Sequence, residues 1–229
     1  MVPAAGRPAL DGLYDDPIWP RNVTARNLDG RLLFVNRLIE DRTPGTVDEP
    51  QGYQWLAMHD FTHLYLYVVF ERGNRRTDAV NPHRDSANFH DDDVLSLYFD
   101  GDHGRTASPD GAKDRRLVIP MIRPEPLEGQ PRAFSPDPAS AALAASLEFH
   151  ACVCEDEAES AWEVRIPTAE LGIAFDRPFG FEVRIDQDVD GGPGESSWAW
   201  ASPMPGERDA GFEHGSPAFY GTVVLSSNR

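Results

Sequence analysis

The stretch His63–Glu71 (HLYLYVVFE) decides the fold, because tyrosine, valine and phenylalanine fill most of it. These residue types favour strands, so the stretch predicts a long, half-buried strand. Residues 60–62 before it predict a tight connection to another candidate strand at 53–57. Similar short runs recur along the chain between turn residues, and the 20 prolines and 19 glycines leave room for few long helices. The pattern predicts an all-β fold with two packed antiparallel sheets.

The remaining runs extend this pattern toward the C-terminus. Pro120 lies within one of them and predicts an edge strand or a bulge there. A short helical turn or a plain loop is expected at 138–145, and a helical turn at 168–171 that ends at Gly172. The fold class predicted is therefore a β-sandwich of jelly-roll or immunoglobulin-like type with short helical turns. The further strands are expected at residues 94–100, 116–122, 147–154, 160–166, 179–186, 198–201 and 220–225.

Composition limits the partners. The formal net charge is -17, which repels nucleic-acid phosphates and anionic lipids, so we expect neither nucleic acid nor membrane as a partner. No apolar run reaches the roughly 20 residues of a membrane helix. Cys152 and Cys154 are too close in sequence for an unstrained disulfide. Residues 1–12 lack the apolar segment of a signal peptide, which predicts a cytoplasmic protein as written, or a secreted or periplasmic one if a leader was removed.

Several motifs follow one another in an order similar to that of family 9 carbohydrate-binding modules. Residues 10–19 (LDGLYDDPIW) resemble the family's opening, a hydrophobic residue followed by Asp-Gly-x-x-Asp-x-x-x-Trp. Residues 162–172, with Glu163, Ile166-Pro167 and Leu171-Gly172, resemble its Glu-x-x-Ile-Pro-x-x-x-Leu-Gly. The other matching segments are 60–66, 92–100, 180–188 and 221–225. Together they imply a single domain over residues 1–229, with its core at about residues 10–225.

The resemblance implies a function as well as a fold. Family 9 modules are non-catalytic, bind a mono- or oligosaccharide between loop aromatics and carry calcium. They usually sit beside catalytic domains, so an enzyme is an expected partner. The same sandwich occurs in DOMON domains, some of which bind haem, and fold alone does not decide function.

Five residues are candidates for the sugar site. Trp198 and Trp200 alternate along a strand and so share one face, where an indole can stack on a sugar ring. The resemblance favours Trp200 of the two, places Phe89 as the second aromatic, and puts Ser96 where the family carries a glutamate. Arg116 resembles the family's sugar-contacting arginine. The alternative for both tryptophans is a place in the sandwich core. For Phe89 it is an ordinary loop anchor, and for Arg116 a solvated charge at a sheet edge.

Two acidic segments are candidates for calcium. Carboxylates at alternate positions followed by Gly191 resemble the first half of an EF-hand loop, although Ser197 stands where such a loop needs glutamate. A second cluster precedes the strand at 94–100. Plain solvated acidic turns are the alternative in both places. The calcium ligands predicted are Asp186, Asp188, Asp190, Asp92 and Asp93.

Two other functions remain open. A DOMON-type haem domain needs an axial pair such as methionine with lysine or histidine. Met58, Met121 and Met204 are available, and Lys113 is the only lysine of the sequence. A polysaccharide-active enzyme could be built on the same sandwich. We expect no enzyme, because the nucleophile-elbow, phosphate-loop and dinucleotide motifs are all missing from the sequence.

Overall fold

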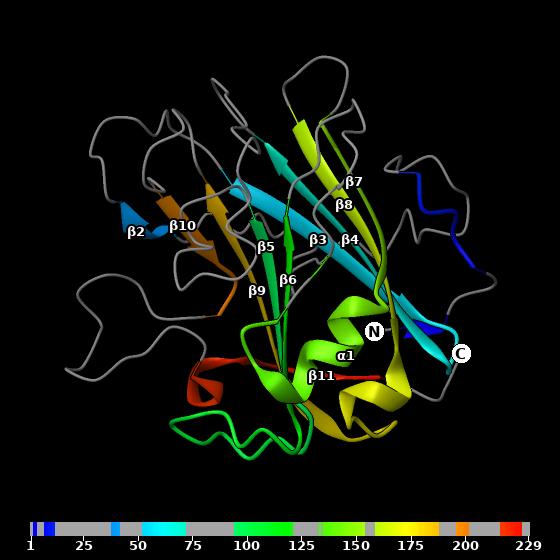
Figure 1. The fold of residues 1–229 in the computed structure, drawn as a ribbon, viewed down its shortest axis with the longest axis vertical. Helices are drawn as coiled ribbons and strands as arrows, with labels where there is room; N and C mark the ends of the chain where they lie inside the picture. The colour runs from blue at the N-terminus through cyan, green and yellow to red at the C-terminus, as the bar shows by residue number, and fades with distance from the viewer. Residues whose placement is uncertain are drawn as a thin grey trace, which may run out of the picture.

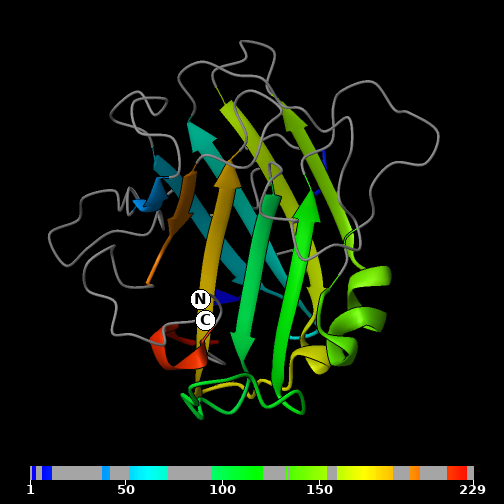
Figure 2. The same cartoon turned by 60° about the vertical axis from the view of Figure 1, so that its left-hand side comes forward.

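The computed structural model describes residues 2–3, 7–11, 38–41, 52–71, 94–120, 133, 135–153, 159–187, 196–201 and 216–225. Two β-sheets pack face to face in this part of the chain, as predicted, and short helices lie at their margins (Figures 1 and 2). None of the described helices is long and apolar enough to cross a membrane.

The first sheet has five strands in the order β1-β3-β4-β8-β7. The short strand β1 runs parallel to β3, and the other pairs are antiparallel. The prediction for His63–Glu71 is confirmed with its bounds, and this strand lies at the centre of the sheet as β4. The bounds of the others are β1 Val2–Pro3, β3 Gly52–His59, β7 Glu148–Val153 and β8 Glu159–Pro167.

The second sheet has six strands, five of them in the order β2-β10-β9-β5-β6. The sixth, β11, pairs with the first residues of β9, while β10 pairs with its last residues. Strand β6 lies at the end of the path, which confirms the edge position predicted from Pro120. The bounds are β2 Leu38–Asp41, β5 Val94–Asp100, β6 Asp114–Pro120, β9 Pro178–Gln187, β10 Ser196–Ala199 and β11 Gly221–Val224.

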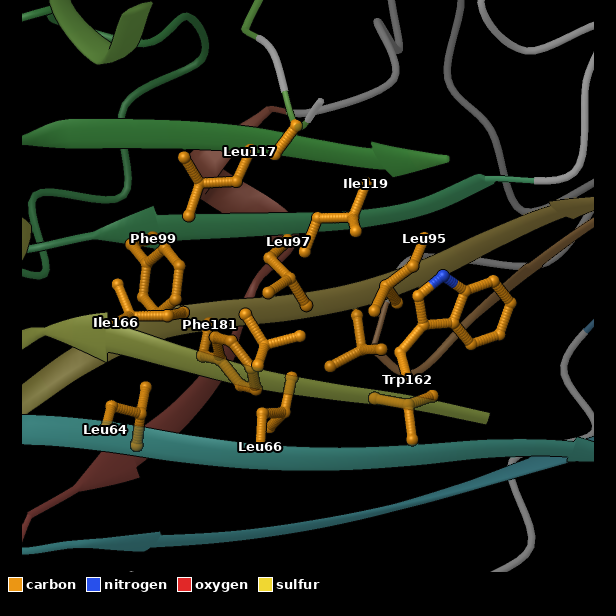
Figure 3. Packing of buried hydrophobic residues seen from close by; sticks show 14 of the residues in the cluster. Leu64, Leu66, Leu95, Leu97, Phe99, Leu117, Ile119, Trp162, Ile166 and Phe181 are labelled. Atoms are coloured by element: carbon orange, nitrogen blue, oxygen red, sulfur yellow. The ribbon is translucent and has the colours of Figure 1, made fainter. Parts of the chain in front are cut away.

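The core lies between the two sheets, because alternate residues of each strand point inward. Leu64 and Leu66 of β4 face Leu95, Leu97 and other residues of the second sheet across this layer (Figure 3). The side chain of Trp162 from β8 is 1 % exposed and closes one part of it. Burial of this apolar layer is the main force that holds the sheets together.

Short helical segments close the edges. The helices η2 (Pro138–Ser140) and α1 (Ala141–Ala145) confirm the predicted helical segment, and the Arg116 N–H of β6 donates to Ser140 Oγ at 3.1 Å. The turn η3 (Thr168–Leu171) ends at Gly172, whose φ of 66° suits glycine. A last turn, η4 (Pro217–Phe219), leads into β11.

Asp60 forms the tight connection between β3 and β4. Its Oδ1 accepts the backbone N–H groups of Thr62 at 2.9 Å and His63 at 2.7 Å. Its Oδ2 accepts the Tyr65 hydroxyl at 2.8 Å. Against a desolvation cost that acts in the opposite direction, these hydrogen bonds hold the pKa of Asp60 far below its ordinary value. The charged form of this carboxylate therefore organises the hairpin.

Candidate functional site

The outer face of the second sheet is polar at its centre. Strands β5, β6 and β9 lie side by side, and their inward residues belong to the core, so the alternate residues lie on the opposite face. We call this set of six residues the polar face. It consists of Ser96, Tyr98, Arg116, Glu182, Arg184 and Asp186.

The register of the strands arranges these side chains in rows. Glu182, Tyr98 and Arg116 are directly opposite one another across β9, β5 and β6. Arg184 lies opposite Ser96 in the next row. All six are buried except Arg116, which is partly exposed. Buried polar groups are costly unless they are bonded, so such a concentration on one sheet face points to a binding function or an extended polar network.

Arg184 and Asp186 form a buried ion pair on strand β9. The Arg184 Nε donates to both carboxylate oxygens of Asp186, at 2.9 and 3.1 Å. The two side chains are 3 % and 0 % exposed. Because the guanidinium group is planar and held by two oxygens, its orientation on the polar face is fixed.

Arg116 and Tyr98 form a second contact across β6 and β5. The Arg116 Nη2 donates to the Tyr98 hydroxyl at 3.2 Å, and its guanidinium carbon lies 5.0 Å from the centre of the Tyr98 ring. The Tyr220 ring also packs against the Tyr98 ring, with 5.7 Å between ring centres. Burial raises the pKa of Tyr220 well above its ordinary value, so this phenol stays neutral.

Glu182 connects the polar face to the end of β10. Its Oε1 accepts the backbone N–H groups of Trp200 at 2.7 Å, Val183 at 3.0 Å and Ala201 at 3.1 Å. Its Oε2 accepts the Ala201 N–H at 2.9 Å. The carboxylate therefore holds the chain at the point where it leaves the sheet.

The structure brings three predicted site residues together on the polar face: Ser96, Arg116 and Asp186. Ser96 is fully buried, and its hydroxyl has no hydrogen-bond partner within the part of the chain that the structure describes. A buried hydroxyl without a partner calls for an explanation, and a hydrogen-bonding ligand is one candidate.

Trp200 lies apart from these residues, on the core side of the sheet. The backbone N–H of Trp200 donates to the backbone carbonyl oxygen of Val183 at 3.1 Å, which continues the pairing of β10 with β9. Its ring packs edge-on against Trp55 of β3, with 5.0 Å between ring centres, and lies against Gly221 of β11. The indole is partly buried at the margin of the core. Packing thus accounts for much of its surface, and sugar stacking on its exposed part stays a prediction.

The side chains of the other two predicted aromatics, Trp198 and Phe89, are not described by the structure. Trp198 pairs in register with Ile185, a core residue, and only its backbone is described. Phe89 lies outside the described residues, as do four of the predicted calcium ligands: Asp92, Asp93, Asp188 and Asp190.

Asp186 does not fit the calcium role predicted for it. Arg184 occupies its carboxylate and already neutralises it, so a cation would have to displace a bound guanidinium. Within the described part of the chain, no three His, Cys, Asp or Glu side chains are grouped as metal ligands.

A haem site needs its axial ligands on two sides of one pocket. Met58 is buried with Tyr65 and Tyr67 on the outer face of the first sheet. Lys113 lies in the β5–β6 loop of the second sheet, where its Nζ donates to Asp102 at 2.7 Å. The structure therefore does not bring this methionine and this lysine together.

Two carboxylates, Asp100 and Asp114, lie where β5 ends and β6 begins. Asp100 and Asp114 are directly opposite each other, and both are buried. Desolvation, together with the charges of Asp100, Asp110 and Asp102, raises the pKa of Asp114 to about 6. The Asp110 N–H donates to Asp114 Oδ2 at 2.8 Å and acts in the opposite direction.

Sequence reasoning missed Tyr98, Glu182 and Arg184. A signal was present in residues 181–186 (FEVRID), where charged residues alternate with phenylalanine, valine and isoleucine. Such alternation indicates a strand with one polar face.

Comparison with known proteins supports the fold. No protein-family model matches the chain, and no curated protein matches it. A family 9 carbohydrate-binding module from Caldicellulosiruptor kristjanssonii in complex with cellotriose has a TM-score of 0.63 and 14% identity, over 100% of this chain and 94% of the other. A family 9 module from the same organism in complex with glucose has a TM-score of 0.60 and 14% identity, over 100% and 98%. At this identity the likeness establishes the β-sandwich fold.

Proposed function

We propose that the protein binds a mono- or oligosaccharide at the polar face and catalyses no reaction on it. The observation that carries this proposal is the set of oriented donors and acceptors on three neighbouring strands, within a fold like that of sugar-binding modules. Sugars offer many hydroxyl groups, each of which can both donate and accept a hydrogen bond.

The chemistry of the polar face suits such hydroxyls. Arg116 and Arg184 carry planar arrays of N–H donors, and Ser96 offers one donor and acceptor. Ion pairing holds Arg184 in one orientation, and the Tyr98 ring supports Arg116, so little side-chain freedom is lost on binding. Burial lowers the local dielectric constant and strengthens each hydrogen bond made there.

The aromatic surface for the sugar ring is proposed among Trp200, Trp198 and Phe89. Because the Trp200 indole lies on the core side of the sheet, only its exposed part, at the margin of the sandwich, is open to a sugar. Partial exposure of the Trp200 indole supports this assignment. Calcium is proposed for the acidic segments that contain Asp92, Asp93, Asp188 and Asp190, on the strength of their carboxylate pattern alone.

Calorimetric titration with glucose, cellobiose, cellotriose and xylobiose tests the proposal. We expect saturable binding to at least one sugar, and a loss of at least about tenfold in affinity for Arg116→Ala, as for a lost charge-assisted hydrogen bond. Arg115→Ala is the matched control, because this neighbouring guanidinium donates to the Glu170 and Ala112 oxygens instead. Its affinity should equal that of the wild type.

Two results would count against the proposal. The absence of binding to every sugar would refute the function, and equal affinity in Arg116→Ala would move the site away from the polar face. Incubation of the pure protein with labelled oligosaccharides tests the enzyme alternative, for which cleavage products would be the positive result.

A further inference from the structure

We infer that Glu182 is a positioning residue for the proposed sugar site, and the inference rests on that proposed function. Glu182 lies in the same row as Tyr98 and Arg116 and is 2 % exposed. From this place its carboxylate reaches sideways to the backbone of Trp200 and Ala201. It thus links the polar face to the segment that carries the predicted stacking aromatic.

The hydrogen bonds leave this carboxylate little capacity to contact a sugar directly. Ionised glutamate has about four lone-pair sites on its two oxygens. The Val183, Trp200 and Ala201 N–H groups supply the four bonds described above, three of them to Oε1. The group is therefore suited to fixing the backbone rather than to recognising a hydroxyl.

The hydrogen bonds to Glu182 lie at the end of strand β10. Strand β10 ends at Ala199, and the two residues held by Glu182 follow it immediately. Backbone bonds at a strand end fix where the next side chains lie, so Glu182 sets the position of the Trp200 indole at the margin of the core. A clamp of this kind holds the segment after β10, which carries the predicted stacking aromatic, in place before ligand arrives.

Replacement by glutamine is a sharp test, because the amide has the same shape but one oxygen becomes an N–H₂ donor. If the nitrogen replaces Oε2, it faces the Ala201 N–H; if it replaces Oε1, three hydrogen bonds are lost. Either orientation sets a donor against a donor at the end of β10.

The chain offers a matched control in Glu163→Gln. Glu163 is fully buried on the first sheet, and its Oε2 accepts the backbone N–H of Asp11 at 2.7 Å. Both variants remove one buried negative charge and weaken a backbone contact, but only Glu182 borders the polar face. A purely structural role predicts the same behaviour for both variants.

The experiment measures Tm and the affinity for cellotriose and glucose in both variants and in the wild type. We expect both Tm values to fall, and only Glu182→Gln to lose affinity, by about tenfold. Equal affinities for wild type and Glu182→Gln would overturn the inference while leaving the proposed function intact. No binding by the wild type would instead refute the proposed function.

A second measurement needs no variant and applies if Glu182→Gln does not fold. Hydrogen exchange of the wild-type amides is compared with and without saturating cellotriose. Because Glu182 holds these N–H groups before ligand arrives, exchange at Trp200 and Ala201 should already be slow without cellotriose and stay slow with it. Fast exchange at both amides in the ligand-free protein would overturn the inference.

Discussion

Replacement of Asp114 by asparagine should stabilise the protein at neutral pH. The carboxylate is buried opposite Asp100, and its pKa is raised to about 6, first by desolvation and then by neighbouring charges. A raised pKa means that the folded state binds the proton more tightly than the unfolded state does. The charged form therefore destabilises the fold above pH 6, and this penalty disappears as the pH falls from about 6 toward 4.

The size of the effect follows from the same shift. A rise from 3.8 to about 6 corresponds to at most about 3 kcal/mol. The loop that precedes Asp114 is exposed at Asp102 and Asp110, so nearby water weakens both the desolvation and the neighbouring charges, and we expect a gain of about 1 kcal/mol. Asparagine stays neutral, and its oxygen can still accept the Asp110 N–H.

Urea unfolding of wild type and Asp114→Asn at pH 8, 7, 6, 5, 4 and 3 measures this difference. The variant should be more stable at pH 8 and 7, the difference should shrink below about pH 6, and it should vanish only below the ordinary pKa of 3.8. No gain at pH 8 would refute the reasoning, as would a gain that is undiminished at pH 3. Asp110→Asn is the control: backbone hydrogen bonds, led by that of Lys113, lower the pKa of Asp110, so its replacement should not stabilise the fold at any of these pH values.

Three further results are expected. Trp200→Ala should lower the free energy of unfolding by about 3 kcal/mol, which is the lower end of the range for a large core aromatic, because the ring is partly exposed. A loss below about 1 kcal/mol, measured by urea unfolding, would contradict the packing of this ring against Trp55. Gly221→Ala should cost about 1–3 kcal/mol, because its Cβ would overlap the Trp200 ring, and Trp200→Ala should remove most of that cost in a double-mutant cycle. Asp60→Asn should destabilise the protein by about 1 kcal/mol, opposite in sign to Asp114→Asn. The loss should be the same from pH 7 down to about pH 4.5 and should shrink only below the ordinary pKa of 3.8, as thermal unfolding at pH 7, 5, 4, 3 and 2 can check.

The strands could be predicted from the sequence because alternation and turn residues are local properties. His63–Glu71 and Val94–Asp100 have the predicted bounds, and the edge position of β6 followed from one proline. Strands β1 and β2 were missed, because two and four residues are too few to show a period. Their place depends on partners far away in the chain.

The candidate site was predictable only in part. Ser96 and Arg116 were identified, yet their shared face with Arg184 depends on the pairing of three strands from distant parts of the sequence. Alternation predicted that Trp198 and Trp200 share a face. Which face it is depends on the register with β9, and the bond from Trp200 to the Val183 oxygen places the indole beside the core.

The hydrogen bond between Arg116 and Ser140 also bears on aggregation through the edge strand β6. An edge strand presents unpaired N–H and C=O groups, which another chain can use to extend the sheet. The Ser140 hydroxyl accepts a hydrogen bond from the Arg116 N–H of β6. Ser140 is the last residue of η2, and α1 follows it directly. The Ser140 side chain thus occupies one of the groups through which another chain could extend the sheet at β6.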